Sequence, residues 1–598
     1  MKRLKNILLS MDPNTGTYIE MYEGPILVIP SDGPSYEDND NTYYRDSIGY
    51  RIHRSNKNAL DRPTVTIQIP FDLLGIENQT NATADYCLRA FRSYVDELNA
   101  NLCNRSRPDK ENGKYYLYHP GPEILLRNTA YFGMIGQKDY ENGVGNSVYL
   151  MNENISYPPK MCLCIRIQMQ LPYKKMRKTI QMLCRDLPEA VDKFVAQLDH
   201  KKLYDVLSLA SKQDAIRAWL KQSEYCVFIA NGSILPRSKG TDLPLNHAIP
   251  FKSTANDEIE VCGVRGIAIK RGVTVITGGG YSGKSTLLDA ISAGIYDHIE
   301  GDGRELCITD ASAVTICAED GRSVKNVNIS PFIQWIPGGN TSDFSTEHAS
   351  GSTSQAANMM EAVNLGAKLL LIDEDKSATN FMIRDKMMRE LIEKEPVIPF
   401  TDRVNELYHQ QGVSTILIIG GSGEYISVAD KIYRMDDFSI HDVTKQSKQI
   451  CKKYSITTDF LKPIRWTYHR TLLSNGFTPY PEGSGAERLE ISNMGFVLIG
   501  DELIDIRSLR NIVSPAQLTA LGFMLRQLEI KNNELKIDID KCIDELYEQI
   551  EQEGLDSVFS GFFTTCERFM DLPRKFELLA VINRMRNVNF ISEDSDVQ

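Results

Sequence analysis

The pattern of apolar and polar positions divides the chain into three stretches of different character. Up to about residue 245, the alternating runs PTVTIQIPF (64–72) and MCLCIRIQMQL (161–171) predict strands with one buried face, and residues 187–210 predict a helix. From 246 to 445, the apolar runs VTVIT, KLLLID and STILIIG alternate with helical patterns, which is typical of a parallel α/β sheet. Residues 446–598 predict a short strand-rich section, GFVLIGDELIDI, then helices.

These stretches predict three domains. They are an α+β domain over 1–245, an α/β domain over 246–445, and a mostly helical domain with some strands over 446–598. A chain of 598 residues is longer than one hydrophobic core usually supports. The segment NGSILPRSKGTDLPLN, rich in Gly, Pro and Ser, marks the first boundary, and the acidic tail ISEDSDVQ is expected to be disordered.

Composition restricts the partners and the compartment. The net charge is −12, so a nucleic acid would have to bind local basic patches rather than the protein as a whole. No apolar run has the length of a membrane span. The apolar run near the start of the sequence is too short for a secretory signal. The 12 cysteines show no metal-type spacing. We therefore expect a cytoplasmic protein without a membrane partner, with a mitochondrial presequence as the alternative.

A glycine-rich loop follows the apolar run VTVIT. Residues 278–285, GGGYSGKS, satisfy the pattern G-x-x-x-x-G-K-[ST], and the helical stretch STLLDAISAGIY comes next. Glycines let successive backbone N–H groups turn inward, and the helix N-terminus adds its positive end, so this order predicts a phosphate site. Lys284 should reach the β- and γ-phosphates and Ser285 should bind Mg²⁺. The predicted nucleotide-binding residues are Gly278, Gly279, Gly280, Tyr281, Ser282, Gly283, Lys284, Ser285 and Thr286.

Two adjacent carboxylates end the next informative strand, KLLLIDED. Asp373 is placed to hold Mg²⁺ through water, and Glu374 is placed to polarise an attacking water. Neighbouring carboxylates repel each other, so a cation accounts for them better than a solvated strand end does. We predict Asp373 as a metal ligand and Glu374 as the catalytic base.

A small-residue loop stands 23 residues before Asp373, at Ser350. Residues 349–353 open a helical stretch, where N–H groups and a hydroxyl can meet a phosphate; alone, they would indicate only a Ser/Gly helix cap. Their order between the two preceding motifs, followed by Ser377-Ala378-Thr379-Asn380, resembles the signature loop and D-loop of ABC-type ATPases.

The resemblance extends over most of the chain. GGGYSGKSTLL, ISPFIQWIPGG, FSTEHASGSTSQAAN, LLLIDEDKSATNFMIRD and IIGGSGEY together resemble a group of soluble ABC-class ATPases of bacteria and some unicellular eukaryotes that are not attached to transporters. The resemblance implies an ABC-type α/β P-loop NTPase domain between an α+β N-terminal and a mostly helical C-terminal domain. It also implies ATP and Mg²⁺ bound between two head-to-tail copies, and RNA association. It assigns Ser350 and Gly351 to the nucleotide site of the partner copy, and Ser352, Ser377 and Asn380 are further predicted nucleotide-binding residues.

The chain departs from this family pattern in two places. Only 66 residues separate Lys284 from Ser350, so the helical subdomain that docks on membrane domains is nearly missing, and we exclude a transporter. Gln334 is then the equivalent of the Q-loop glutamine, with a catalytic and metal-binding role. STILIIG ends in Gly420-Gly421-Ser422-Gly423, where the family carries a histidine, and Ser422 is predicted to contact the γ-phosphate instead. The missing histidine leaves two alternatives open, an ATPase and a nucleotide-gated dimerising scaffold with little turnover.

Three basic clusters are candidates for RNA or single-stranded nucleic acid, because arginines interleaved with aromatics can neutralise phosphates and stack on bases. Solvated helix faces with some buried aromatics are the alternative, and an ATPase directed at DNA or a small molecule also stays open. The clusters are Lys174, Lys175, Arg177, Lys178 and Arg185; Arg465, Trp466, Tyr468, His469 and Arg470; and Arg574, Lys575, Arg584 and Arg586.

Overall fold

The chain forms two compact units in the computed structural model. Unit 1 comprises Met1–Pro120, Ile124–Leu207 and Glu548–Leu572, and unit 2 comprises Gly121–Glu123, Ser208–Tyr547 and Pro573–Gln598. The boundaries at 245 and 445 stay predictions. The residues that the structure describes are 2–10, 42–45, 48–53, 62–76, 78–102, 112–135, 160–173, 175–254, 257–392, 394–453, 465–477, 489–492, 495–499, 502–531, 536–559 and 568–592.

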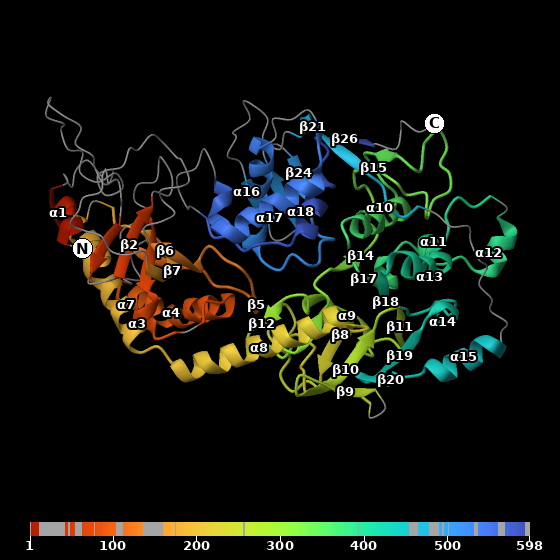
Figure 1. Cartoon of the computed structure of the whole chain (residues 1–598), viewed down its shortest axis with the longest axis horizontal. Coiled ribbons are helices and arrows are strands. Elements are labelled where there is room, and N and C mark those ends of the chain that lie inside the picture. The colour runs from red at the N-terminus through yellow and green to blue at the C-terminus, as the bar shows by residue number, and fades with distance from the viewer. Residues whose placement is uncertain are drawn as a thin grey trace. The chain divides into compact units, whose positions relative to one another are not determined.

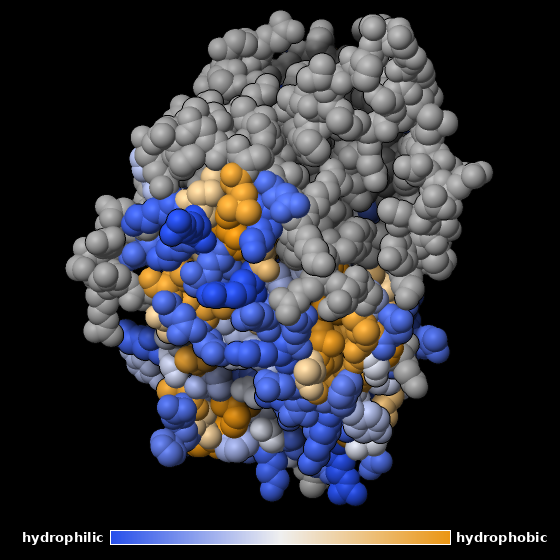
Figure 2. All heavy atoms as spheres, turned by 90° about the vertical axis from the view of Figure 1, so that its left-hand side faces the viewer, coloured by the Kyte–Doolittle hydropathy of each residue, from blue (hydrophilic) through white to orange (hydrophobic). Residues whose placement is uncertain are grey.

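Unit 1 is built on an antiparallel sheet in the order β1, β2, β3, β7, β4, with β6 also paired to β7 (Figure 1). The strands are β1 Thr42–Arg45, β2 Ile48–His53, β3 Thr64–Pro70, β4 Lys114–Leu117, β6 Ala130–Ile135 and β7 Lys160–Gln170. Both runs predicted as strands are confirmed, and they are neighbours, with Ile67 opposite Ile165. The face shown in Figure 2 carries mainly hydrophilic side chains, with apolar ones in separate small groups, as expected of a water-exposed surface.

The helices of unit 1 pack on this sheet. They are α1 Lys2–Ser10, α3 Phe71–Leu74, α4 Asn81–Leu102, α6 Met176–Gln181, a π-helical turn Met182–Asp186, α7 Leu187–Ala196 and the start of α8 His200–Gln222. The single helix predicted over 187–210 is therefore wrong, because α7 ends before Gln197 and α8 begins at His200.

Strand β7 is buried on both faces, so the prediction of one buried face for 161–171 is wrong. Leu163 and Cys164 point to opposite faces and are 0% and 4% exposed. The cause is a distant part of the chain, residues 548–572, which folds into unit 1. Arg166 of β7, 2% exposed, forms an ion pair with Asp556 in the 3₁₀ turn Leu555–Phe559. A local pattern gives no sign of a cover that comes from so far along the sequence.

Unit 2 contains a six-stranded sheet in the order β14, β17, β18, β11, β19, β20. The strands are β11 Val273–Gly278, β14 Ala313–Ile316, β17 Leu369–Asp373, β18 Ser414–Ile418, β19 Lys431–Asp436 and β20 Ser439–Asp442. All neighbours are parallel except the β19–β20 hairpin. The three apolar runs of 246–445 are thus confirmed as parallel strands, and their burial on both faces explains why they are continuously apolar.

Helices and a smaller sheet complete the central part of unit 2. The helices are α9 Lys284–Ala293, α10 Gly351–Asn364, α11 Thr379–Met382, α12 Lys386–Leu391, α13 Phe400–Gln411, α14 Tyr425–Val428 and α15 Thr444–Lys453. The smaller antiparallel sheet has the order β13, β8, β10, β9, with bounds Cys307–Thr309, Tyr225–Ala230, Val264–Lys270 and Glu258–Val261. Two short pairs are β5 Glu123–Ile124 with β12 Asp297–His298, and β15 Val324–Val327 with β16 Phe344–Thr346.

The C-terminal part of unit 2 combines helices with two small sheets. It contains α16 Pro515–Lys531, α17 Ile539–Glu553, which runs on into unit 1, α18 Lys575–Ile582, β21 Arg470–Phe477, β22 Leu489–Ser492, β23 Phe496–Ile499, β24 Glu502–Asp505, β25 Lys536–Ile537 and β26 Val588–Ser592. GFVLIGDELIDI is the β23–β24 hairpin. Of the tail predicted as disordered, Ile591 and Ser592 belong to β26, and residues 593–598 lie outside the described residues. Among the described helices, none combines the length and hydrophobicity that a bilayer crossing requires.

Candidate functional site

Three of the predicted motifs meet at one edge of the six-stranded sheet. Strand β18 lies between β11 and β17, with Leu417 opposite both Val275 and Ile372. Because the three strands are parallel, their carboxyl ends lie side by side, and this is where ligands bind in open α/β sheets. The glycine-rich loop, the Asp-Glu pair and the loop at 420–423 therefore share one edge.

The glycine-rich loop requires glycine at both of its ends. Gly278 and Gly283 have φ angles of 149° and 97°, in the left-handed region. A Cβ at Gly278 would lie 2.4 Å from the Met435 carbonyl oxygen, and one at Gly283 would lie 2.6 Å from the Phe438 ring. Gly279 and Gly280 are exposed, with open space where a Cβ would be.

The lysine amine lies inside the loop. Lys284 Nζ donates to the carbonyl oxygens of Gly278 and Gly279, both at 2.8 Å. Ser282 Oγ donates to the Gly279 carbonyl at 2.9 Å, and α9 begins at Lys284. Ser285 is exposed at the first turn of this helix. The loop thus brings an amine, a hydroxyl and a helix N-terminus together, which suits a polyphosphate.

Asp373 and Glu374 have different surroundings. Asp373, 4% exposed, ends β17; its Oδ1 accepts from the Asp375 N–H at 3.2 Å, and its Oδ2 lies 3.7 Å from Lys376 Nζ. Glu374 reaches across to the loop after β18, where its Oε2 accepts from the N–H groups of Gly420 (2.6 Å) and Gly421 (3.2 Å). The carboxylate predicted as a base is therefore held by the loop that lacks the family's histidine.

The signature loop and the D-loop form one surface. Ser350 caps α10 by accepting from the Thr353 N–H, and Ser352 Oγ donates to Asn380 Oδ1 at 2.7 Å. Gln355, buried, donates to Ser377 Oγ at 3.0 Å. Gly351, Ser352 and residues 375–380 line an open hollow of about 570 Å³. Gln355 could not be found from the sequence, because its role depends on the packing of α10 against the D-loop.

Ser422 and Gln334 have less support from the geometry. Ser422 is 7% exposed, and within the described part of the chain its hydroxyl has no hydrogen-bond partner, so it is free to meet an added oxygen. The Gln334 side chain is exposed, and its backbone N–H donates to the Pro396 carbonyl at 2.8 Å. Among the described residues, no hydrogen bond joins Gln334 to the glycine-rich loop or to Asp373, and its role stays a prediction.

Phe438 touches the glycine-rich loop and was missed from the sequence. It occupies the β19–β20 turn with Asp437, and both have positive φ angles, 43° for Asp437 and 63° for Phe438. Such turns favour Asn and Gly, and a bulky residue with positive φ is unusual. The Phe438 N–H donates to the Ser282 carbonyl at 3.1 Å, and its ring faces Gly283. In the sequence, an aromatic residue at this turn was the feature that could have indicated its contact with the glycine-rich loop.

The structure changes the view of the basic clusters. The interpretation of 465–470 as an exposed stacking surface is wrong, because Trp466 and Tyr468 are 1% and 3% exposed in the core around the six-stranded sheet, as the alternative with buried aromatics predicts. Trp466 Nε1 donates to Gln410 Oε1 at 3.0 Å. Arg574 and Arg584 are also engaged inside unit 2, with Glu577 and Glu319. In the first cluster Arg177 and Arg185 are exposed, and Lys174 lies outside the described residues.

The oxygen donors suit the expected metal. Within the described ranges, no three His, Cys, Asp or Glu side chains gather into a metal-binding group. Ser285 and Asp373 offer oxygen ligands only, and Mg²⁺ prefers to be held by one or two protein oxygens together with substrate phosphates and water. These residues therefore fit Mg²⁺ that arrives with a nucleotide.

A strand, a glycine-rich loop with an internal lysine, and a helix, next to a buried strand-end aspartate, define a P-loop nucleotide-binding protein. Residues 199–464 match the family model ABC_ATPase, described as a P-loop domain, and residues 488–591 match the MRB1590 C-terminal domain. The uncharacterized protein MJ1628 of Methanocaldococcus jannaschii is 30% identical over 344 residues, which are 52% of this chain and 74% of that protein. The chain belongs to the ABC-class ATPase family, as its motifs predicted.

Solved structures of ABC transporter ATP-binding cassettes are also similar. The ADP conformation of MJ1267, an ATP-binding cassette of an ABC transporter, has 14% identity and a TM-score of 0.24, over 39% of this chain and 97% of that one. CbiO1 from Clostridium perfringens, part of the transporter complex cbiONQ, has 15% identity and a TM-score of 0.25, over 39% of this chain and 95% of that one.

Proposed function

We propose that the protein hydrolyses ATP with Mg²⁺ at a site that two copies complete, arranged head to tail. The observation that supports this proposal is that the glycine-rich loop, residues 278–286, does not line the hollow of the signature loop and the D-loop. One chain thus presents a nucleotide loop and, apart from it, a second set of small polar groups suited to a phosphate. A second copy supplies the missing half of each site.

Each residue has a definite task in this arrangement. Lys284 exchanges its two carbonyl partners, Gly278 and Gly279, for the β- and γ-phosphates. Ser285 and Asp373 would hold Mg²⁺, with Gln334 as a further candidate, and the ion when bound neutralises charge on the phosphate oxygens. Ser350, Gly351 and Ser352 would face the nucleotide of the other copy, with N–H groups of the α10 terminus directed at its γ-phosphate.

Glu374 is the group that takes the proton from the attacking water. As a base it must be free to meet that water, and its present partners are the N–H groups of Gly420 and Gly421. Those N–H groups and the Ser422 hydroxyl are the donors that stand where a histidine was expected. We infer that binding of the γ-phosphate draws this loop toward the phosphate and releases the Glu374 carboxylate.

The test is phosphate release by the full-length protein with ATP and Mg²⁺. Wild type should turn over ATP, EDTA should stop it, and Lys284→Ala should lower nucleotide affinity by at least about tenfold, because a charge-assisted phosphate contact is lost. Lys368→Ala serves as a matched control, since that lysine is exposed at the start of β17, outside the site. Absence of Mg²⁺-dependent turnover in wild type would contradict the hydrolytic proposal.

The contacts of Glu374 also favour a second candidate, a nucleotide-gated scaffold in which ATP drives dimerisation with little turnover. If the hydrogen bonds from the Gly420 and Gly421 N–H groups to Glu374 persist with ATP bound, the carboxylate is not available to take a proton from water. Light scattering and phosphate release measured on the same samples separate the two. Strong ATP-induced dimerisation of wild type without phosphate release favours the scaffold, whereas dimers that decay at the rate of phosphate release favour the ATPase.

Coupling to RNA is the final part of the proposal, and its support is the exposed Arg177 and Arg185 beside Lys175 and Lys178. Fluorescence titrations with RNA, single-stranded DNA and duplex DNA at two salt concentrations test it. Affinity for RNA that falls with salt, and that weakens in Arg177→Ala relative to wild type, supports this role. Equal, salt-independent signals for all three nucleic acids would contradict it.

A further inference from the structure

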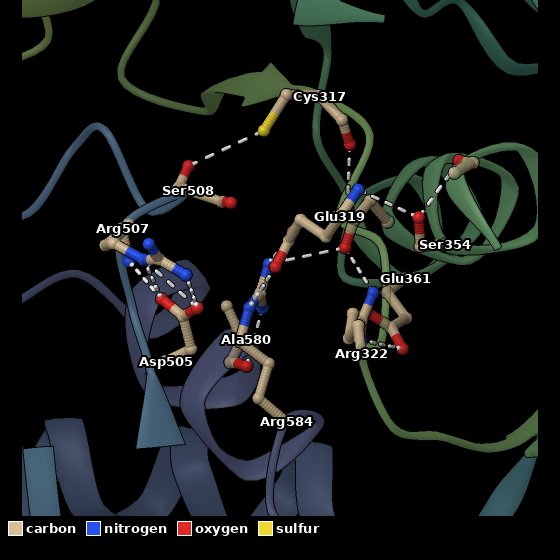
Figure 3. A network of polar contacts seen from close by, with 12 residues as sticks. Cys317, Glu319, Arg322, Ser354, Glu361, Asp505, Arg507, Ser508, Ala580 and Arg584 are labelled. Atoms are coloured by element: carbon tan, nitrogen blue, oxygen red, sulfur yellow. Dashed lines mark hydrogen bonds and ion pairs between the residues drawn. The ribbon is translucent and has the colours of Figure 1, made fainter. Parts of the chain in front are cut away.

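A short loop in unit 2 connects the signature helix, the D-loop and the C-terminal helices. It comprises residues 317–323, between β14 and β15. Figure 3 shows Glu319 of this loop between Arg584 on one side and Ser354 of α10 on the other. None of its residues belongs to the nucleotide motifs, although Ala318 and Asp320 line the same hollow as Gly351, Ser352 and residues 375–380.

On one side, the loop is tied to the signature helix. The Glu319 N–H donates to Ser354 Oγ at 2.9 Å, and Asn358 Nδ2 of the same helix donates to Glu319 Oε1 at 2.7 Å. The Gly321 N–H donates to the Ala349 carbonyl at 2.8 Å, and the Ala349 N–H donates back to the Arg322 carbonyl at 2.9 Å. The residue immediately before Ser350 is thereby fixed by a two-way backbone bridge.

The loop also contacts the D-loop. The Ala318 N–H donates to the Lys376 carbonyl at 3.0 Å. Gly351 fits between the two loops: a Cβ at this position would lie 3.2 Å from Asp320 Oδ1 and 3.5 Å from the Ala378 Cβ. With so little free space, a displacement of residues 317–323 moves the signature loop and the D-loop together.

On the other side, the loop is held by the C-terminal residues. Arg584, directly after α18, forms a two-point ion pair with Glu319, with Nη2–Oε1 at 2.5 Å and Nε–Oε2 at 3.1 Å. The two side chains are only 7% and 10% exposed. Arg584 Nη1 donates to the Ala580 carbonyl at 2.7 Å, which fixes the guanidinium to α18 (Figure 3). A nearby second arginine, Arg586, donates to the Gly321 carbonyl at 3.3 Å.

The electrostatics keep this pair ionised. Burial alone would raise the pKa of Glu319, but the charges of Arg584 and Arg322 outweigh burial and hold the pKa below its usual value. Breaking one partner of a buried pair leaves the other charge unpaired, so the contact resists separation. Its two-point geometry also fixes the direction of the Glu319 side chain, which a single lysine contact would not.

We infer that Arg584 and Glu319 are a positioning pair, through which α18 and the residues that follow it set the signature loop and the D-loop and thereby control ATP turnover. This inference rests on the proposed function, because the two loops act on the nucleotide of the other copy. Neither residue touches the nucleotide. A partner that shifts α18 would then change turnover without changing the binding of ATP to the glycine-rich loop.

Kinetics of Arg584→Ala test the pair against a matched control, Arg507→Ala. Arg507 also pairs with a carboxylate, Asp505, in the same C-terminal part, but the two side chains are 67% and 48% exposed. We expect Arg584→Ala to lower kcat at least tenfold, with the ATP dissociation constant of the isolated chain within twofold of wild type. Arg584→Lys, which restores the charge, should recover part of the loss, and Arg507→Ala should behave as wild type. A kcat for Arg584→Ala equal to that of the control would overturn the inference.

Hydrogen exchange gives a readout that does not depend on turnover. In Arg584→Ala, the amides of 349–354 and 376–380 should exchange at least tenfold faster than in Arg507→Ala, while those of β11 stay unchanged. If wild type shows no turnover, the proposed function fails, and exchange alone still decides whether the pair positions the loops. If Arg584→Ala does not fold, Glu319→Gln, which keeps the side-chain shape, takes its place with the same expectations. Unchanged exchange at 349–354 would contradict the positioning role.

Discussion

The Glu374 carboxylate and the Gly420 backbone N–H are joined by a hydrogen bond of 2.6 Å, and the Gly421 N–H adds a second at 3.2 Å. The loop after β18 therefore meets the proposed base directly, through backbone donors rather than an imidazole. A carboxylate held in this way is directed toward the sheet edge where the glycine-rich loop ends. In the proposed mechanism, this link would let the 420–423 loop decide whether ATP is hydrolysed or only bound.

Replacing Glu374 with glutamine should lower kcat by about 100-fold or more, because a general base contributes about that much. ATP affinity should stay within about threefold, since Lys284 and the loop glycines are unchanged. Single-turnover phosphate release and equilibrium nucleotide binding measure the two quantities. Glu390→Gln, on the exposed side of α12, is the matched control and should behave as wild type. Full turnover in Glu374→Gln would mean that another group activates the water.

Gly283→Ala should destabilise the protein by about 1–2 kcal/mol, the cost of a side chain with left-handed backbone, and should weaken ATP binding. The added Cβ would also meet the Phe438 ring at 2.6 Å, so the β19–β20 turn must move. Gly280→Ala is the control for stability, because a Cβ there meets open space. Urea unfolding and nucleotide titration check both variants. Equal midpoints for the two variants would show that the loop tolerates a side chain at 283.

The sequence was sufficient for the strand-and-loop frame of the site. Apolar runs in 246–445 predict β11, β17 and β18, and G-x-x-x-x-G-K-S fixes the loop between β11 and α9, because these are local patterns with a fixed chemical reason. The links across the sheet edge were not predictable. The bond from Glu374 to Gly420 and the packing of Phe438 on Gly283 depend on strand order, which local patterns do not specify.

Asp85→Ala should lower the free energy of unfolding of unit 1 by about 3 kcal/mol, because it removes one partner of a buried arginine. Asp85 forms ion pairs with Arg127, which is 2% exposed, and with Arg89. Arg127 Nε also lies 3.0 Å from Asp571 Oδ1, so the distant segment 548–572 takes part in the same group of ion pairs. Denaturant unfolding measures the loss.

The control for that variant is Asp96→Ala, which removes an exposed pair with Arg92 on the same helix. Its effect should be below about 0.5 kcal/mol, as expected for a surface substitution. Similar losses for both variants would contradict a structural role for the buried pair.

The pair of His298 and Asp302 should make stability depend on pH. His298 is 1% exposed; its Nδ1 lies 2.9 Å from Asp302 Oδ2, and its Nε2 lies 3.1 Å from the Ala293 carbonyl. Burial alone would lower the pKa of His298, but Asp302 and then Glu123 outweigh it, and the pKa is raised. The pair's contribution is therefore complete below the unfolded value of about 6.5 and is lost as pH rises through the folded pKa.

His298→Gln should accordingly cost about 1–3 kcal/mol at pH 6 and less at pH 9, because a hydrogen bond to a charged group is lost only where the imidazole is charged. Urea midpoints at the two pH values give the difference. His409→Gln, at an exposed histidine, should leave the pH dependence as in wild type. A His298→Gln loss of the same size at both pH values would show that folding does not raise the pKa of His298.

Sequence patterns failed where burial came from distant residues. PIRWTYHR has the composition of a stacking surface, yet Trp466 and Tyr468 fill the core beside Phe332, and Arg584 pairs inside unit 2. MCLCIRIQMQL alternates like a strand with one buried face, yet residues 548–572 fold onto the same unit. In each case the residue types are compatible with both surroundings, and only the tertiary fold decides between them.

The central claim is that one chain's glycine-rich loop works with another chain's signature loop, and mixing two inactive variants tests it most directly. Lys284→Ala removes the first element and Ser350→Ala, with Gly351→Ala added if needed, impairs the second. Each variant alone should be nearly inactive. An equimolar mixture should regain up to about a quarter of wild-type turnover, because half of the dimers are then mixed and each contains one intact composite site. A mixture no more active than its two components would contradict a site shared between two copies.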